Sequence, residues 1–297
     1  MRFSVWPTTR QPWADFLDIA VHAERTGWDG VWAADHFMPP APPLDHPTLE
    51  CWAVLAGLAI AVPRVRLGSL VVGNTYRHPA VVANAAATVD QLSGGRLVLG
   101  LGAGWQVNEH EAYGIELPPV GERLARLDEA CAVVKGLLGQ ARTSFDGRYY
   151  QLADAPLDPK PVQDVLPLLI GGGGEKVTLR IAARWADEWN TWGAPEVLAR
   201  KNAVLDRHCE GVGRDPSTLV RSAQAIVVPD EPGVTTVPFP GGPATIVGTA
   251  AALRDQVAAY AEAGVHELIV PDWNTGRGAA RRDFYDWFAT EIAGPFH

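Results

Sequence analysis

Short apolar segments alternate along this chain with longer segments in which apolar residues recur at helical spacing. The apolar segments predict eight strands, at residues 3–6, 30–33, 65–72, 97–101, 167–170, 188–191, 220–228 and 267–270. The longer segments predict a helix after each strand, at about 12–26, 49–62, 79–92, 121–138, 176–185, 195–212, 250–263 and 279–292. Eight strands, each followed by a helix, are typical of the (β/α)8 or TIM barrel, an α/β fold with a parallel sheet.

Two segments interrupt this alternation. Before the fifth strand, Asp146-Gly147 stands between aromatic residues and predicts a β-hairpin over 143–152. After the seventh strand, a long insertion rich in proline and glycine covers 229–243. A doubly wound fold would place its glycine fingerprint after the first strand, where residues 7–9 read Pro-Thr-Thr. Because neither a linker nor a shift in composition divides the chain, we expect a single barrel domain over residues 1–297.

The stretch 96–114 concentrates unusual residues after the fourth strand. The apolar run ends in the glycines Gly100, Gly102 and Gly104. An aromatic residue, Trp105, and the polar residues Asn108, Glu109 and His110 follow. Glycines at the carboxyl end of a strand allow backbone and ligand to approach closely, and an indole beside amides suits the mouth of a ligand pocket. The alternative is a tight turn in which Trp105 fills the core.

Other candidate groups also follow predicted strands, where the reactive residues of a barrel lie. Asp35-His36, after the second strand, is a candidate acid–base pair. Its alternative is a loop in which Asp35 caps a turn and His36 is solvated. We expect Arg281-Arg282, on the last helix, to lie on a solvated face.

The run Gly171–Glu175 opens the fifth helix and could cradle a phosphate through free backbone N–H groups. The alternative is a packing turn, and phosphate sites of barrels more often follow strands seven and eight. Tryptophans near several strand ends could wall a pocket for a flat ring, although each alone is as consistent with core or rim. They are Trp6, Trp105, Trp189, Trp192 and Trp273.

The composition of the chain limits the classes of binding partner that we expect. The formal charge is 25 − 34 = −9, without a long basic run, so we expect neither nucleic acid nor an acidic membrane surface as a partner. The longest apolar run, 52–62, is too short to span a bilayer, and the N-terminus does not read as a signal peptide. Cys51, Cys131 and Cys209 are too far apart for a disulfide framework or a zinc pattern, which favours a reducing cytoplasm.

We expect no metal site. The histidines His46, His78 and His110 lie without chelating spacing, and the first strand lacks the closely spaced histidine pair of barrel metallohydrolases. A metal-dependent hydrolase is therefore a weak alternative.

Four segments together resemble the bacterial luciferase-like monooxygenase superfamily. They are AADHF at 33–37, LGSLVVGNTYRHPAVVA at 67–83, SGGRLVLGLGAGW at 93–105 and IGGGGEKVTLRIAARWADEWNTW at 170–192. Within it, the chain looks most like the actinobacterial oxidoreductases that use coenzyme F420, an 8-hydroxy-5-deazaflavin. The likeness runs in order from about residue 1 to 292.

The resemblance implies a set of cofactor contacts. The ring would lie against a bulge at Leu70-Val71, often with a non-proline cis peptide, and would contact Asp35 and His36. Further contacts match Asn74, Ala103, Gly104 and Asn108, and the loop holding the cofactor phosphate matches Gly172, Gly173, Gly174, Glu175 and Lys176. In related sugar-phosphate dehydrogenases, the histidine that matches His36 assists hydride transfer. The resemblance also suggests a homodimer.

One position departs from those dehydrogenases, because Trp105 stands where they carry a glutamate. This change favours an apolar or aromatic small-molecule substrate stacked near the ring, with Trp6, Trp192 and Trp273 as further contacts. We expect an F420-linked hydride transfer in which His36 handles the accompanying proton.

Two other functions stay open on the sequence. The first is an FMN-dependent monooxygenase that uses O2 and a flavin reductase partner. The second is a non-catalytic flavin- or deazaflavin-binding protein. The acidic tail of F420 would lie near Lys160, Lys176 or Arg180, or remain free.

Overall fold

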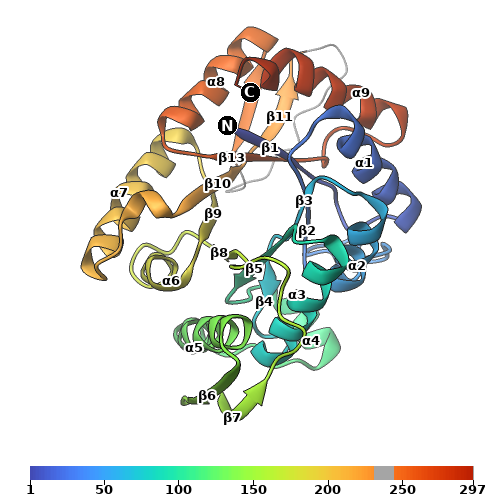
Figure 1. Ribbon diagram of the computed structural model, residues 1–297. Helices are drawn as coiled ribbons and strands as arrows, with labels where there is room; N and C mark the ends of the chain where they lie inside the picture. Colours follow the sequence, from blue (N-terminus) through green and yellow to red (C-terminus); the bar gives the residue numbers. More distant parts are fainter. Residues whose placement is uncertain (231–243, 297) are drawn as a thin grey trace.

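Eight parallel strands close into a barrel in the computed structural model, which describes residues 1–230 and 244–296. They are β1 (Arg2–Trp6), β2 (Gly30–Ala33), β3 (Arg66–Ser69) with its continuation β4 (Val72–Gly73), β5 (Leu97–Gly102), β8 (Leu168–Gly171), β9 (Glu188–Trp192), β10 (Val220–Gln224) and β13 (Glu267–Pro271). The strand order is β3-β2-β1-β13-β10-β9-β8-β5-β4, and the pairing of β3 with β5 closes the ring. The predicted TIM barrel is confirmed (Figure 1).

The helices surround this ring at the predicted places (Figure 1). They are α1 (Trp13–Thr26), α2 (Cys51–Ala61), α3 (Pro79–Ser93), α5 (Val120–Gly139), α6 (Thr178–Trp185), α7 (Pro195–Gly211), α8 (Ala250–Glu262) and α9 (Ala279–Trp287). Short helices are α4 (Val107–Tyr113), η1 (Pro216–Thr218), η2 (Phe288–Ala293) and η3 (Gly294–Phe296). In the described part of the chain, every helix falls short of the length and apolarity that a bilayer span requires.

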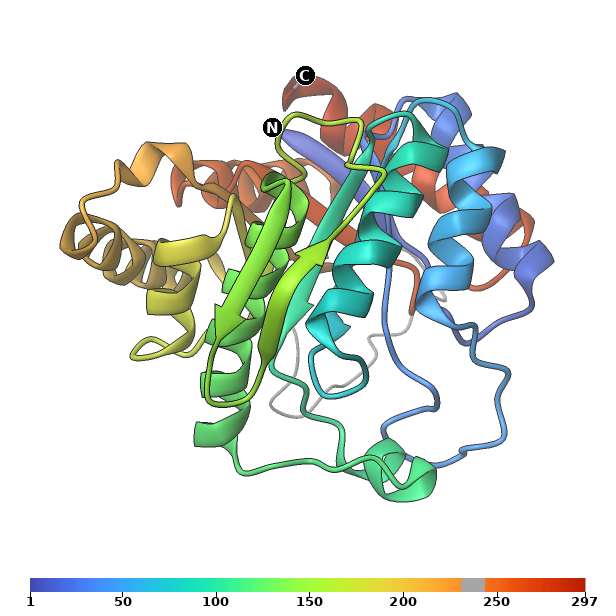
Figure 2. The same cartoon turned by 60° about the horizontal axis from the view of Figure 1, so that its bottom comes forward.

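The predicted hairpin is confirmed, and its second strand is longer than expected. β6 (Arg142–Asp146) and β7 (Gln151–Pro156) pair in antiparallel register, and Figure 2 shows them side by side as long arrows. β7 therefore continues to Pro156, beyond residue 152, where the predicted hairpin ends.

The prediction of one seventh strand over 220–228 is wrong. The barrel strand β10 ends at Gln224, and β11 (Ile226–Pro229) pairs instead with β12 (Thr245–Gly248) in a separate parallel sheet. The change occurs at Ala225, whose amide donates to the Ile269 carbonyl of β13 before the chain leaves the barrel. Most of the insertion expected at 229–243 lies outside the described residues.

The third barrel strand is interrupted by a bulge at Leu70-Val71, and the peptide bond between these residues is cis. The Val71 side chain occupies space that side chains at two glycines would fill. A Cβ placed on Gly102 or Gly171 would lie 2.7 Å or 2.8 Å from Val71 Cγ2. The glycines at the ends of β5 and β8 thus make room for the chain's own bulge, and this explains part of the glycine-rich pattern.

Paired charges fill the end of the barrel interior that lies away from the Leu70-Val71 bulge. Arg66 pairs with both Glu188 and Glu267, and the Glu267 carboxylate also accepts hydrogen bonds from Ser4 Oγ (2.7 Å) and Trp32 Nε1 (2.9 Å). Burial raises the pKa of Glu188 although Arg66 opposes the shift. This layer lies near the amino ends of the strands. It therefore stabilises the end of the barrel opposite to the one where active sites of this fold lie.

Candidate active site at the mouth of the barrel

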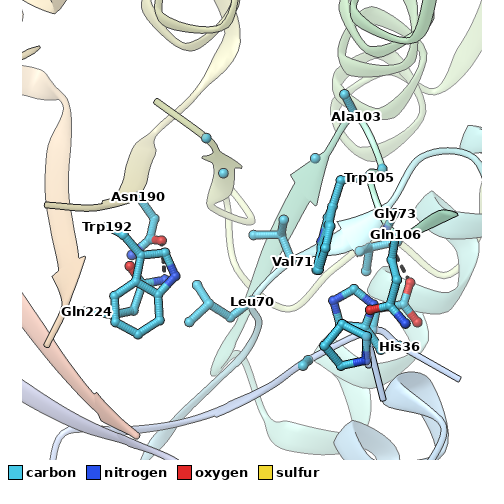
Figure 3. Close-up of a pocket in the computed structure, with 18 of the residues that line it drawn as sticks. His36, Leu70, Val71, Gly73, Ala103, Trp105, Gln106, Asn190, Trp192 and Gln224 are labelled. Atoms are coloured by element: carbon cyan, nitrogen blue, oxygen red, sulfur yellow. Dashed lines mark hydrogen bonds between the residues drawn. The ribbon is translucent and has the colours of Figure 1, made fainter. Parts of the chain in front are cut away.

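A cavity of about 580 Å³ opens at the carboxyl ends of the barrel strands, and its size is typical of small-molecule sites. The structure brings eleven of the predicted site residues to its wall. They are Trp6, Asp35, His36, Leu70, Val71, Ala103, Gly104, Trp105, Gly172, Trp192 and Trp273. Figure 3 shows Leu70 and Val71 between Trp192 on one side and His36 with Trp105 on the other.

The predicted residues Asn74 and Asn108 are not among the residues that line the cavity, and both side chains tie loops together. Asn74 Nδ2 donates to the Tyr150 hydroxyl (3.1 Å), and Asn108 Nδ2 donates to the Pro39 carbonyl (2.9 Å). Both side chains keep a buried Oδ1 for which the described residues supply no hydrogen-bond partner. Each therefore retains a buried acceptor, in segments that also carry the lining residues Gly73 and Gln106.

The glycine loop after β8 presents bare backbone. Gly172 has a φ of 127°, in the left-handed region that favours glycine, and its neighbours have no space for side chains. A Cβ on Gly173 would lie 2.8 Å from Thr191 Oγ1, and one on Gly174 would lie 2.8 Å from Thr178 Oγ1. Gly173, Gly174, Glu175 and Lys176 continue the loop beyond the cavity wall.

A cation that the sequence analysis missed accompanies this loop. Lys201 Nζ, on α7, donates to the Gly173 carbonyl (2.5 Å) and lies 3.5 Å from Glu175 Oε1. Lys160, by contrast, donates to carbonyls at the C-terminal end of α5, including that of Leu137 (2.6 Å). Since helix C-termini lie at the amino ends of the strands in this fold, Lys160 is far from the cavity.

Glu109 is the partner of His36. His36 Nδ1 lies 2.7 Å from Glu109 Oε1, the Phe37 amide donates to Oε2 (2.8 Å), and the Tyr76 hydroxyl donates to Oε1. Burial raises the pKa of Glu109. The hydrogen bond and the charge of His36, together with the hydrogen bonds from Tyr76 and Phe37, outweigh burial and hold that pKa below its ordinary value. Because an ionised carboxylate only accepts, Nδ1 carries a hydrogen and Nε2 is left for the cavity.

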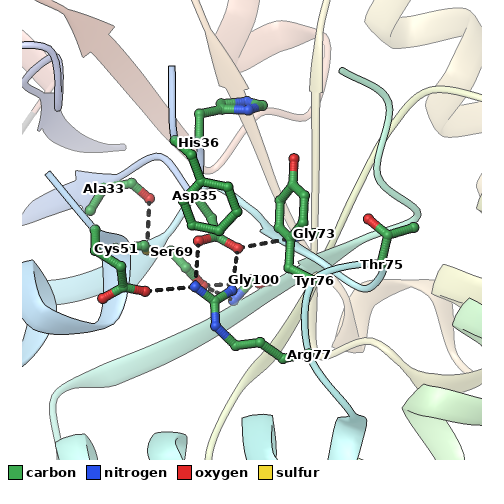
Figure 4. Close-up of polar contacts among 12 residues, drawn as sticks. Ala33, Asp35, His36, Cys51, Ser69, Gly73, Thr75, Tyr76, Arg77 and Gly100 are labelled. Carbon is green, nitrogen blue, oxygen red and sulfur yellow. Dashed lines mark hydrogen bonds and ion pairs between the residues drawn. The ribbon is translucent and has the colours of Figure 1, made fainter. Parts of the chain in front are cut away.

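The sequence makes Asp35 a candidate acid–base partner of His36, but in the structure it forms an ion pair with Arg77. Its buried carboxylate forms two ion-paired hydrogen bonds with Arg77 (2.7 and 3.1 Å) and accepts from the Gly73 amide (3.1 Å). Arg77 also reaches Glu50 (2.6 Å). Burial raises the pKa of Asp35 although Arg77 opposes the shift. Figure 4 shows this clamp, which joins the segment after β2 to the segment after β4.

The tryptophans divide into wall, rim and core. Trp6, Trp192 and Trp273 pack against one another with ring centroids 5.0–5.8 Å apart. Trp105 is 60% exposed and stands edge-on to His36 at 5.4 Å. Trp189 is buried in the core and donates to the Gly172 carbonyl (2.8 Å), so its expected place in the wall is wrong.

The expectation that Arg281 is solvated is also wrong. Its guanidinium is buried and donates to Asp272 Oδ2 (2.8 Å) and Gln11 Oε1 (2.8 Å). Asp272 in turn accepts from the Thr8 amide (2.8 Å), so this ion pair fixes the chain next to Trp6 and Trp273.

Known proteins resemble this chain in sequence. The family model described as luciferase-like monooxygenase matches residues 1–232. The chain belongs to the luciferase-like monooxygenase family. An uncharacterized protein from Mycobacterium bovis is 31% identical over 218 residues, which cover 71% of this chain and 76% of that protein.

Two further relatives of this luciferase-like protein bear a functional name. An F420-dependent glucose-6-phosphate dehydrogenase of Kineococcus radiotolerans is 42% identical over 172 residues, 57% of this chain and 50% of that protein. The dehydrogenase of the same name from Amycolatopsis mediterranei is 39% identical over 175 residues, 58% and 51% of the two chains. The luciferase-like chain thus matches about half the length of these curated relatives.

Solved structures share the fold at lower identity. An F420-dependent secondary alcohol dehydrogenase in complex with an F420–acetone adduct superposes with a TM-score of 0.87 at 22% identity, over 100% of this chain and 99% of the other. A coenzyme F420 dependent tetrahydromethanopterin reductase from Methanopyrus kandleri gives 0.84 at 17% identity, with the same coverage. These two matches show that the barrel fold is shared.

Glu109→Gln should make the protein less stable near neutral pH, and the deficit should shrink in acid. A carboxylate whose pKa is lowered by folding stabilises the native state above its unfolded pKa of about 4.3, and this contribution is lost as the pH falls through the folded value. Chemical unfolding of both proteins between about pH 6 and pH 3 measures the difference. Glu111→Gln, exposed on the same helix, is the control. A deficit that grew in acid would contradict the assigned ionisation.

Proposed function

We propose that the protein is an oxidoreductase that transfers a hydride between coenzyme F420 and a small organic substrate. The names of the curated relatives support the choice of coenzyme. The observation that carries the proposal is the composition of one cavity: His36, held by Glu109, lines the same space as the Leu70-Val71 bulge and the first glycines of the loop after β8.

The residues present suit this cofactor. Leu70, Val71, Ala103 and Gly104 offer a surface of backbone and small aliphatic groups against which a flat tricyclic ring would lie. The loop from Gly172 to Lys176 is a cradle that side chains would fill, and backbone N–H groups in such a loop bind phosphate. Lys201 supplies a nearby positive charge. Asn74 and Asn108 keep buried acceptors in the segments that carry the lining residues Gly73 and Gln106.

Bound F420 supplies a ring carbon that donates or accepts a hydride. The protein's task is then to handle the proton that accompanies the hydride. His36 Nε2 is the group placed to hold or release that proton, and Glu109 compensates the positive charge that protonation creates. Burial and the bond to Glu109 raise the pKa of Tyr76, so its hydroxyl stays a neutral donor that fixes the same carboxylate.

His36→Ala should lower turnover by about 10²–10⁴-fold while F420 still binds, because the variant removes the proton-handling group and leaves the bulge and the glycine loop intact. The assay follows anaerobic reoxidation of reduced F420 by a panel of ketones and enones, or its reduction by alcohols. Unchanged turnover in the variant would contradict the role of His36.

The anaerobic condition separates this function from its alternatives. A flavin monooxygenase on the same barrel would require oxygen and reduced FMN, and a non-catalytic binding protein would hold F420 without substrate-dependent turnover. Turnover that depends on O2 and FMN would therefore overturn the proposal.

We also propose that the protein is a homodimer in the cytoplasm. The free thiols of Cys51, Cys131 and Cys209 suit a reducing compartment. α2 is apolar on nearly all sides, and although such helices are usually buried, it exposes Ile60 (71%). A second copy of the chain that covers this end of α2 would bury Ile60.

Ile60→Glu should convert the dimer to a monomer, because the new carboxylate would be buried without a partner in the interface. Sedimentation velocity measures the mass of the variant and of the wild type. Val165→Glu, at a similarly exposed valine outside α2 and α3, is the control and should leave the dimer intact. A wild-type monomer, or a dimer that tolerates Ile60→Glu, would refute this interface.

A further inference from the structure

The two sides of the cavity differ in chemistry. His36 and Trp105 lie on one side, after β2 and β5 (Figure 3). On the other side, Trp6, Trp192 and Trp273 form one continuous aromatic surface, which we call the tryptophan wall. If the ring of the cofactor lies on the bulge and its phosphate on the glycine loop, the cofactor does not extend over the tryptophan wall. The inference below thus rests on the proposed function.

A buried amide pair adjoins the tryptophan wall. Trp192 and Gln224 are register partners in the parallel strands β9 and β10, and Asn190 and Ser222 are partners two residues earlier. Residues two apart in a strand share a face, so all four project from the same side of the sheet. Figure 3 shows Asn190 and Gln224 next to Trp192. The wall and the amides thus form one compartment.

The hydrogen bonds of this pair leave one acceptor open. Asn190 Nδ2 donates to Ser222 Oγ (2.9 Å), which directs Asn190 Oδ1 toward Gln224 Nε2, its donor at 2.6 Å. Gln224 is 4% exposed and lines the cavity, yet its Oε1 has no hydrogen-bond partner among the described residues. A buried acceptor without a partner is costly, so a ligand that donates a hydrogen bond there is favoured.

The charge of the cavity lining argues against an anionic substrate beside the cofactor. The charged side chains among its described lining residues are Arg10, Asp35 and, when protonated, His36. Arg77 already neutralises Asp35, which leaves Arg10 as the one permanent cation of the lining. A phosphate monoester carries about two negative charges at neutral pH and is usually held by several Arg or Lys donors. An uncharged substrate fits this lining better.

We propose that the tryptophan wall and Gln224 form the substrate subsite. The geometry points to a flat, uncharged cyclic substrate that stacks on the indoles and donates an O–H or N–H hydrogen bond to Gln224 Oε1. Sugar phosphates, the substrates named for the curated relatives, lack the flat apolar face and carry charge that this compartment does not balance. The subsite therefore separates this chain from those relatives in specificity.

Calorimetric titration of the cofactor-free protein tests the subsite without turnover. The probes are 2-naphthol, naphthalene and glucose 6-phosphate, which differ in the hydroxyl donor, the flat ring and the charge. 2-Naphthol should bind roughly tenfold more tightly than naphthalene, because it alone satisfies Gln224, and glucose 6-phosphate should not bind. Equal affinity for 2-naphthol and naphthalene, or preference for glucose 6-phosphate, would overturn the assignment.

Two variants assign the effect to named groups. Gln224→Leu should reduce the affinity for 2-naphthol to that for naphthalene and leave naphthalene unaffected, whereas Trp192→Ala should weaken both. Gln256→Leu, on the outer helix α8, is the control for the amide substitution. Circular dichroism shows whether each variant is folded. If a variant does not fold, the comparison of the three probes on the wild-type protein decides the question.

Titration of F420 in the presence of 2-naphthol separates the failure of the subsite from the failure of the proposed function. Both ligands should bind together. Competition between them would assign Gln224 to the cofactor and overturn the subsite. Binding of 2-naphthol without any binding of F420 would overturn the proposed function and support the tryptophan wall as a ligand site.

Discussion

The carboxylate of Glu109 is the group on which the arrangement of the barrel mouth depends. A buried negative charge must be satisfied by donors, and these come from the segments after β2 and β4, through His36, Phe37 and Tyr76. The short helix α4 presents the carboxylate to both segments at once. One buried group therefore orients the imidazole and ties together three separate parts of the chain.

The Asp35–Arg77 clamp and the bulge at Leu70-Val71 extend the same construction. The clamp joins the segments after β2 and β4 beneath His36, and Gly102 and Gly171 leave the space that Val71 occupies. The histidine and the floor of the cavity are thus held by the same two segments. A ring on that floor and a proton group beside it would keep a fixed relation, which hydride transfer requires.

Much of the fold could be predicted from local patterns, and the site only in part. Short apolar runs identified the barrel strands, helical spacing identified their helices, and residues at the strand ends supplied His36 and the tryptophans. The role of Glu109 was missed because its partners are far away in sequence and the helix that carries it is short. The buried Arg281 and the cation Lys201 were missed for the same reason: an ion pair or a hydrogen bond across elements leaves no periodic signal.

The measurement that tests the central claim most directly is the titration of cofactor-free protein with F420 and, separately, with FMN, followed by quenching of tryptophan fluorescence. Trp105 beside His36, together with the tryptophan wall, would report a ring in the cavity. The account predicts micromolar binding of F420 and far weaker binding of FMN. Preference for FMN, or binding of neither, would contradict it.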